Sequence, residues 1–245
     1  MAVDRTILDA LAPKGVLRAG INMANFLLVS GACPDGTPDG LSPDLARRIA
    51  AELGVACEFI CYDGPGELAD AVANDIWDIG NIAVEPARAK TIDFTIPYTQ
   101  IDANFLVRTD TPFDDNGSVD SPGVSIAVYG RSAYDLWLSE NLVSAEIVRC
   151  NSIDASHDMF RQGKTDVLAS LKPKLREEMG KTDGVRIIEP PFTGIQQAVG
   201  IRKGQQPVVD YLNALVAMLI KDGFIARSMA THGVEDSLSI PAALN

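Results

Sequence analysis

Residues 78–98, DIGNIAVEPARAKTIDFTIPY, combine residue types and spacing that suit the binding of a small anion. The pattern predicts a short strand, a turn opened by Glu85 and Pro86, an exposed Arg88, and a second apolar strand ending in an aromatic residue. An arginine just past a strand end can hold a carboxylate, because its planar guanidinium offers two parallel charge-assisted hydrogen bonds and stays ionised. The alternative is that Arg88 pairs with Glu85 or Asp93 at the surface.

The overall charge excludes one class of partner. Acidic residues outnumber basic ones by 33 to 21 in the 245-residue chain, which gives a formal net charge of −12. A field of that sign repels nucleic acid, and no block of Lys or Arg offsets it. We therefore expect no nucleic-acid binding.

The apolar segments are too short for a membrane span. The run at residues 212–220 is well below the ~20 residues that a span needs. The first 15 residues contain no basic segment followed by an apolar one, so we expect no signal peptide in this sequence. Either the protein is cytosolic or a leader peptide has been removed.

The cysteines and histidines do not form a metal-binding pattern. Cys57 and Cys61 lie on one predicted strand, roughly 13 Å apart and too far for a disulfide. No CxxC pair occurs, and His157 and His232 stand alone on predicted helices. We expect neither a metal nor another cofactor, and we interpret these residues as buried free thiols and surface histidines.

Strand-like and helix-like segments alternate in the first half of the chain. A strand at residues 16–20 precedes a helix for which Ser42 is the expected N-cap, with Pro43 and Asp44 in its first turn and Gly54 at its end. A strand at residues 55–62 and a helix at 66–74 follow. This alternation predicts an α/β fold with a largely parallel sheet.

A second α/β unit begins near Ser125. Its helices are expected to be capped by Ser132 and Ser152, and a polar connector at residues 109–123 precedes it. A return crossing is expected within residues 192–200. The layout predicts two lobes joined by a hinge, with a ligand cleft: residues 1–108 and 196–245 in lobe one, and 109–195 in lobe two.

Several motifs occur in an order and at distances that resemble one family. They are GVLRAGIN, SPDLARRIAAELGV, EPARAKTIDFTIPY, FLVRTD and QQAVGIRKG. Together they resemble the family 3 (polar amino acid type) solute-binding proteins of bacterial ABC transporters. The resemblance implies a type II periplasmic-binding fold and a periplasmic monomer that delivers a small molecule to an ABC permease in the membrane.

In amino-acid binders of this family, the arginine that matches Arg88 clamps the ligand carboxylate. The hydroxyl residue five positions earlier is here Ala83, so only its backbone N–H could contribute. Asn81 and Glu85 offer polar groups on either side.

The family usually has a stacking aromatic in its first loop, where this sequence has Asn25 beside Phe26. Asn25 is either a hydrogen-bonding ligand residue or a turn asparagine. Tyr62 and Asp63 match the second segment of the pocket wall, although Tyr62 could equally pack at a strand end.

In lobe two, the family carries a loop at a helix N-terminus that contacts ligand oxygens. Arg131 takes the position of the usual glycine there, and Ser132 adds a hydroxyl where free backbone N–H groups favour an anion. Arg131 either faces the ligand or points to solvent, and Ser132 can cap the helix and bind. After the strand at 165–170, the aspartate that holds a ligand ammonium is replaced by Leu171, followed by Lys172.

These features predict a non-catalytic binding protein for a small carboxylate-bearing solute, an organic anion or an amino acid derivative, because a leucine cannot pair with an ammonium. One alternative is an enzyme like the cyclohexadienyl and arogenate dehydratases of the same fold, with Glu85, or else Asp63, as general acid. Another is the ligand-sensing domain of a receptor.

Overall fold

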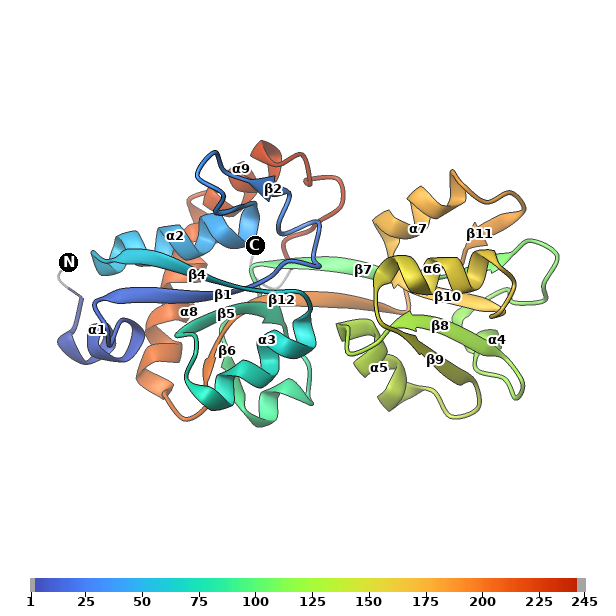
Figure 1. Cartoon of the computed structure of the whole chain (residues 1–245), viewed down its shortest axis with the longest axis horizontal. Coiled ribbons are helices and arrows are strands. Elements are labelled where there is room, and N and C mark those ends of the chain that lie inside the picture. The colour runs from blue at the N-terminus through green and yellow to red at the C-terminus, as the bar shows by residue number, and fades with distance from the viewer. Residues whose placement is uncertain (1–2, 242–245) are drawn as a thin grey trace. The chain divides into compact units, whose positions relative to one another are not determined.

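The computed structural model describes residues 3–241, and the chain divides into two compact units. Unit 1 contains residues 1–100 and 196–245, and unit 2 contains residues 101–195 (Figure 1). The sequence prediction placed residues 101–108 in lobe one. They belong to unit 2, because β7 (Thr99–Arg108) pairs there with β10 (Val167–Leu171) and β11 (Val185–Ile187).

Unit 1 is built on a sheet of mixed direction. Its helical elements are α1 (Arg5–Leu11), α2 (Leu41–Leu53), α3 (Pro65–Ala71), η1 (Val72–Asn74), η2 (Arg88–Lys90), α8 (Gln206–Lys221) and α9 (Phe224–Thr231). Its strands are β1 (Val16–Asn22), β2 (Gly31–Ala32), β3 (Pro38–Asp39), β4 (Ala56–Tyr62), β5 (Ile79–Ala83), β6 (Ile92–Phe94) and most of β12 (Thr193–Arg202). β1 pairs in parallel with β4 and β5, whereas β12 is antiparallel to β5. The carboxyl ends of β1, β4 and β5 therefore meet at one edge, where ligands bind in α/β folds.

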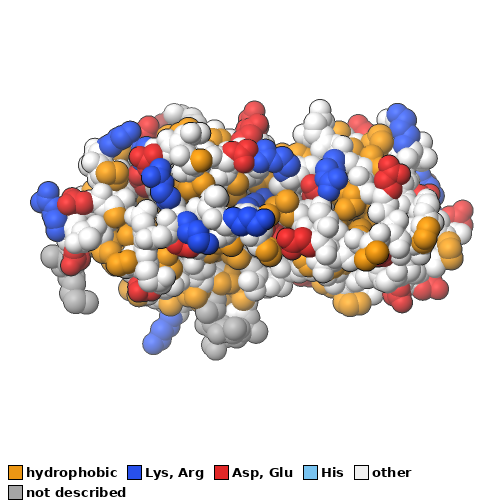
Figure 2. Space-filling view, turned by 90° about the horizontal axis from the view of Figure 1, so that it is seen from below, with side chains coloured by type: hydrophobic (Ala, Val, Ile, Leu, Met, Phe, Trp, Pro, Cys, Tyr) orange, Lys and Arg blue, Asp and Glu red, His pale blue; other side chains and the backbone are white. Residues whose placement is uncertain are grey.

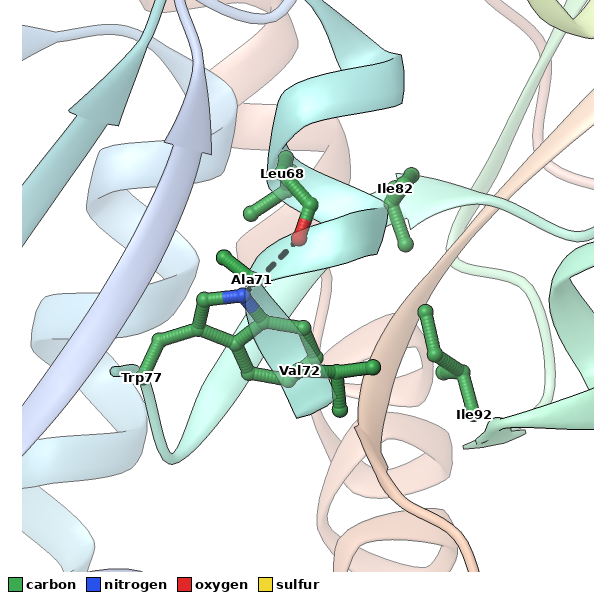
Figure 3. Close-up of a cluster of buried hydrophobic side chains, with 6 residues drawn as sticks. All are labelled: Leu68, Ala71, Val72, Trp77, Ile82 and Ile92. Carbon is green, nitrogen blue, oxygen red and sulfur yellow. Dashed lines mark hydrogen bonds between the residues drawn. The ribbon is translucent and has the colours of Figure 1, made fainter. Parts of the chain in front are cut away.

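Three glycines are register partners on neighbouring strands, and two of them, Gly20 and Gly80, lie under the indole of Trp77. Gly20 of β1 is the register partner of Gly80 in β5, which in turn pairs with Gly200 in β12. A Cβ at Gly20 would collide with Leu68, and one at Gly80 would lie 3.3 Å from the indole. The Trp77 Nε1 donates a hydrogen bond of 2.9 Å to the Leu68 carbonyl, which fixes the ring over the strands (Figure 3).

One prediction about α2 was wrong. Ser42 is not its N-cap, because the helix begins at Leu41 after Gly40, whose φ of 142° suits glycine. The Ser42 hydroxyl instead lies 3.1 Å from the Tyr98 hydroxyl in the core. The end of the helix was predicted correctly, since Gly54 is left-handed with φ 72°.

Unit 2 also combines parallel and antiparallel pairing. Besides β7, β10 and β11, its elements are α4 (Asn116–Val119), β8 (Ser125–Tyr129), α5 (Ala133–Asn141), β9 (Glu146–Cys150), α6 (Ile153–Arg161) and α7 (Lys172–Met179). β8 pairs in parallel with β9 and β10, and β7 is antiparallel to β10. Ser132 and Ser152 cap α5 and α6 as predicted, accepting bonds of 3.1 and 3.0 Å from backbone N–H groups.

The histidines and thiols differ from expectation. His157 is 5% exposed and bonds to Glu178 and Ser170, and the side chain of His232 is 7% exposed. Both were predicted at the surface. Conversely Cys61, predicted to be buried, is exposed, because β4 pairs with β1 and leaves its other side to solvent.

The face shown in Figure 2 carries Lys and Arg side chains interspersed with Asp and Glu. Within residues 3–241, no helix is long and apolar enough to cross a membrane.

Candidate functional site

The candidate site in unit 1 is centred on Arg88. It lies in η2, shortly after the carboxyl end of β5, and is 5% exposed rather than exposed as predicted. Its Nη1 donates a hydrogen bond of 3.0 Å to the carbonyl of Ala83, the last residue of β5. The guanidinium is thus oriented by the strand that precedes it. A positive charge held this deeply favours a partner anion, because burial weakens its hydration.

Asp93 and Glu85 are the two acidic residues that the alternative interpretation offers as partners of Arg88, and both hold backbone N–H groups. The Asp93 Oδ2 accepts a hydrogen bond of 2.6 Å from the Gly204 backbone N–H. Glu85, three residues before Arg88, is 6% exposed, and its backbone carbonyl accepts the N–H groups of Arg88 and Ala89. These two bonds form the turn that places Arg88 at the edge of the sheet.

A buried chain of polar groups supports Asn81, which lies two residues before the end of β5. The Asn81 Nδ2 donates a bond of 2.7 Å to the Ser42 carbonyl, and the Ser42 hydroxyl contacts Tyr98. The Asn81 Oδ1 is buried and has no hydrogen-bond partner among the described residues. Sequence reasoning missed Ser42 and Tyr98 as supports, since nothing in their spacing distinguishes them from core positions.

The remaining residues predicted in lobe one follow the ends of β1 and β4. Asn25 is 8% exposed, and its Oδ1 accepts the Leu27 N–H at 3.3 Å, which is a turn geometry. Phe26 and Tyr62 are half-buried, and burial raises the pKa of Tyr62. Asp63 is exposed. Water therefore reaches the Asp63 carboxylate freely, which counts against its reserve role as a buried general acid.

The loop before α5 in unit 2 is held by an internal network. Arg131 is left-handed with φ 63°, which explains why a glycine suits this position. Its N–H donates to the Asp135 carboxylate at 2.7 Å, and the Asp135 N–H donates to the Ser132 hydroxyl at 3.1 Å. The Asp135 Oδ1 also lies 2.9 Å from the Arg149 Nε. Two backbone N–H groups that we expected to be open for an anion are therefore already bonded within the loop.

The position that holds an acid in amino-acid binders is apolar here. Leu171, the last residue of β10, is 7% exposed. The next residue, Lys172, places its Nζ 2.7 Å from the Glu189 carboxylate. An ammonium near this strand end would meet leucine and a neutralised ion pair.

One group of metal-ligating atoms lies away from these residues. Atoms of Asp39, Asp44 and His232 lie within 4.8 Å of one another. The His232 Nε2 is 2.9 Å from the Asp44 carboxylate and its Nδ1 is 3.0 Å from the Ser30 hydroxyl. The histidine thus links the end of α9 to α2 and to the loop after β1.

Two α/β units, each with polar groups beyond the carboxyl ends of parallel strands, define a two-lobed binding protein. Residues 28–234 match the model of the bacterial extracellular solute-binding proteins, family 3, and the chain belongs to this family. Its curated relatives include the L-cystine-binding protein TcyJ of Escherichia coli, 23% identical and covering 90% of this chain and 83% of the relative. Another is the L-arginine-binding protein of Pseudomonas aeruginosa, 24% identical over 91% and 90% of the two chains.

Solved structures show the same fold. A mutant of ArgBP from T. maritima superposes with a TM-score of 0.73 at 20% identity, covering 94% of this chain and 98% of that one. The ancestral amino acid-binding protein AncCDT-1, described as a precursor of cyclohexadienyl dehydratase, gives a TM-score of 0.71 at 24% identity, with 91% and 98% covered. The expected type II periplasmic-binding fold is confirmed.

Proposed function

We propose that this chain is the non-catalytic substrate-binding component of an ABC importer and that it captures a small carboxylate-bearing solute. The two lobes close around the solute at their hinge, and the closed monomer delivers it to the permease from the periplasm. Membership of the extracellular solute-binding family supports the role. The proposed binding residues are Asn25, Phe26, Tyr62, Asp63, Asn81, Ala83, Glu85, Arg88, Arg131 and Ser132.

The observation that carries the proposal is the buried, oriented guanidinium of Arg88. The hydrogen bond from Arg88 to the Ala83 carbonyl fixes the plane of the guanidinium group. A carboxylate can therefore bind without the entropic cost of first ordering a flexible side chain. A hydrogen bond between two charged groups contributes more than one between neutral groups. Arg88 therefore supplies the main affinity for the solute.

The apolar end of β10 narrows the chemistry of the solute. The Leu171 side chain offers no acceptor, and the neighbouring Glu189 carboxylate is already paired with the Lys172 ammonium. Burying an unpaired ammonium is strongly unfavourable. The proposed solute therefore carries a carboxylate but needs no acidic residue to bind an α-ammonium. It is an organic anion or a modified amino acid.

The first test replaces Arg88 with alanine. Ligand at 100 times its Kd stabilises the native state by about 2.7 kcal/mol, which thermal unfolding detects as a raised Tm. We expect Arg88→Ala to abolish this shift for every solute that stabilises the wild type. Arg202→Ala, which removes a half-exposed arginine from β12 of the same unit, should leave the shift in place. An unchanged shift in Arg88→Ala would refute the clamp.

The second test separates capping from binding at Ser132. Ser132→Ala and Ser152→Ala each remove a helix N-cap, and the two capping hydrogen bonds have nearly equal lengths. Each substitution should therefore cost about 1 kcal/mol of stability. We expect only Ser132→Ala to weaken solute binding as well, measured by calorimetric titration. Equal affinities in the two variants would leave Ser132 as a cap alone.

The solute class is tested by a thermal-shift screen of matched pairs, each carboxylate beside its α-amino counterpart. We expect stabilisation by the non-amino member of a pair. Stabilisation by α-amino acids alone, as the names of the relatives suggest for those proteins, would overturn the inference drawn from Leu171.

A second candidate is a dehydratase on the same fold, which the burial of Glu85 beside Arg88 favours. A carboxyl group that is 6% exposed can serve as a general acid next to a carboxylate clamp. Incubation with prephenate or arogenate tests this directly. Aromatic product above the uncatalysed rate, lost in Glu85→Gln, would establish catalysis and replace the non-catalytic assignment.

A further inference from the structure

Unit 2 contains a cavity that none of the proposed binding residues lines. Its volume is about 320 Å³, at the lower end for small-molecule sites. Its lining residues come from β7, from α4 and α5 with the residue after each, and from position 192. They form two groups of different character, an aromatic wall of three rings and a polar wall that includes Asn116 and Asp120.

The aromatic wall is a stack of three rings. Phe192 lies 4.4 Å from Phe105 and 5.2 Å from Trp137, measured between ring centroids. Phe105 is fully buried and forms the base, while Phe192 and Trp137 are half-buried and line the cavity. Aromatic rings gain from offset or tilted stacking with a further ring. This wall therefore suits a flat aromatic group.

The polar wall includes a residue with an acceptor that has no hydrogen-bond donor near it within residues 3–241. The Asn116 Nδ2 donates to the Pro190 carbonyl at 3.0 Å, which fixes the orientation of the amide. The Asn116 Oδ1 is then left buried without a partner among the described residues. A buried acceptor without a partner is unfavourable by about 1–3 kcal/mol, so a ligand that brings a donor relieves it.

The charge of the cavity is negative. Asp120 is the charged residue among the described residues that line it. Its carboxylate accepts three backbone N–H bonds of 2.7–2.9 Å from residues 143–145, which hold the anion in place. A cationic group is thus complementary to this wall, and an anionic one is repelled.

We propose that this cavity is a second ligand site that takes a small aromatic amine. The ring stacks on Trp137 and Phe192, an ammonium N–H donates to the Asn116 Oδ1, and the positive charge faces Asp120. This ligand is opposite in charge to the solute proposed above. The second site is accordingly separate from the Arg88 site in both residues and chemistry.

The test uses 2-phenylethylamine and its acidic counterpart phenylacetate, titrated calorimetrically into the full chain. We expect saturable binding of the amine with a Kd on the order of 1 mM or below, and much weaker binding of phenylacetate. In Trp77→Phe, which leaves Trp137 as the remaining tryptophan, the amine should also change the fluorescence of Trp137. Equal binding of both compounds, or none, would overturn the proposal.

Two variants in the cavity, with Arg88→Ala as a control outside it, show where the amine binds. Asn116→Leu removes the unpartnered acceptor, is expected to fold, and should weaken the amine about tenfold. Trp137→Leu should abolish the stacking contribution. Arg88→Ala should leave amine binding unchanged, which distinguishes this site from the proposed solute site even if that proposal fails. Full amine affinity in Asn116→Leu and Trp137→Leu, or its loss in Arg88→Ala, would refute the second site.

Discussion

Each unit buries a carboxylate, and the two units neutralise it differently. In unit 1, Asp78 accepts three bonds from Arg18: 2.8 Å from its backbone N–H, 3.1 Å from Nε and 2.6 Å from Nη2. Both side chains are less than 10% exposed. In unit 2, Glu178 accepts bonds from Arg161, Thr182 and His157.

The difference lies in which partner can change its charge. Arginine stays protonated at any ordinary pH, so the charge of Arg18 is constant. His157 can change its charge, and burial lowers its pKa from the ordinary value, so it is neutral in the native state until the solution is acidic. It links Glu178 to the Ser170 hydroxyl, 3.3 Å from its Nε2. Asp78 therefore has a cationic partner of fixed charge, whereas Glu178 also has a partner whose charge responds to acid.

The largest expected effect comes from removing the two carboxylates in turn. Asp78→Ala removes the buried partner of Arg18 and leaves the exposed Asp75, 3.7 Å away, as its remaining carboxylate, so it should cost about 3–5 kcal/mol of unfolding free energy. Glu178→Ala should cost less, about 2 kcal/mol, because the Arg161 side chain is 40% exposed and can turn to water. Urea unfolding measures both. A larger loss in Glu178→Ala would reverse the comparison.

The next effect is the pH dependence that His157 and Glu178 contribute in unit 2. Burial lowers the pKa of His157 below 6.5, so the unfolded chain takes up a proton before the native one and stability falls as the pH drops below about 6.5. Burial alone would raise the pKa of Glu178, but bonds from Arg161, Thr182 and His157 outweigh it and bring it to about 2. A second loss is therefore expected between about pH 4.5 and 2.

Urea midpoints between pH 8 and 5 test the first of these losses. The slope contributed by His157 cannot exceed about 1.4 kcal/mol per pH unit. His157→Gln, which keeps a polar side chain but cannot titrate, should flatten the curve in this range. An unchanged slope in that variant would show that His157 is not the responding group.

The smallest losses of stability are expected from the outer contacts of Glu178 and Arg18. Thr182→Val removes a bond of 2.7 Å to Glu178 and should cost about 1 kcal/mol. Asp75, whose side chain is 64% exposed, lies 3.7 Å from Arg18, and Asp75→Asn should change stability by less than about 0.5 kcal/mol. Similar losses in both variants would indicate that exposure does not govern the outer contacts.

Local signals in the sequence predicted much of the framework. The caps at Ser132 and Ser152 and the terminator Gly54 were recognisable, because each acts on backbone groups within a few residues. The N-cap prediction for Ser42 was wrong because the Ser42 hydroxyl contacts Tyr98, a residue 56 positions away, and not a nearby backbone group. A contact between residues so far apart in the sequence produces no local sequence pattern from which it could be predicted.

The environment of the candidate site was harder to predict than its residue types. Arg88 was predicted to be exposed but is buried, because burial depends on how η2 packs after β5. His157 was missed as a buried residue, although Ile153, Ser156, His157 and Phe160 share the spacing of one helical face. That periodicity was the signal that could have revealed it.

The three register-paired glycines link positions that are far apart in the sequence. Gly20, Gly80 and Gly200 lie on three strands, and a methyl group at Gly20 would meet Leu68 and the indole. A larger residue at one of these glycines needs a smaller or shifted neighbour: at position 68 or 77 for Gly20, at 77 for Gly80 and at 92 for Gly200. During divergence, these positions should therefore vary as a coupled set rather than one at a time.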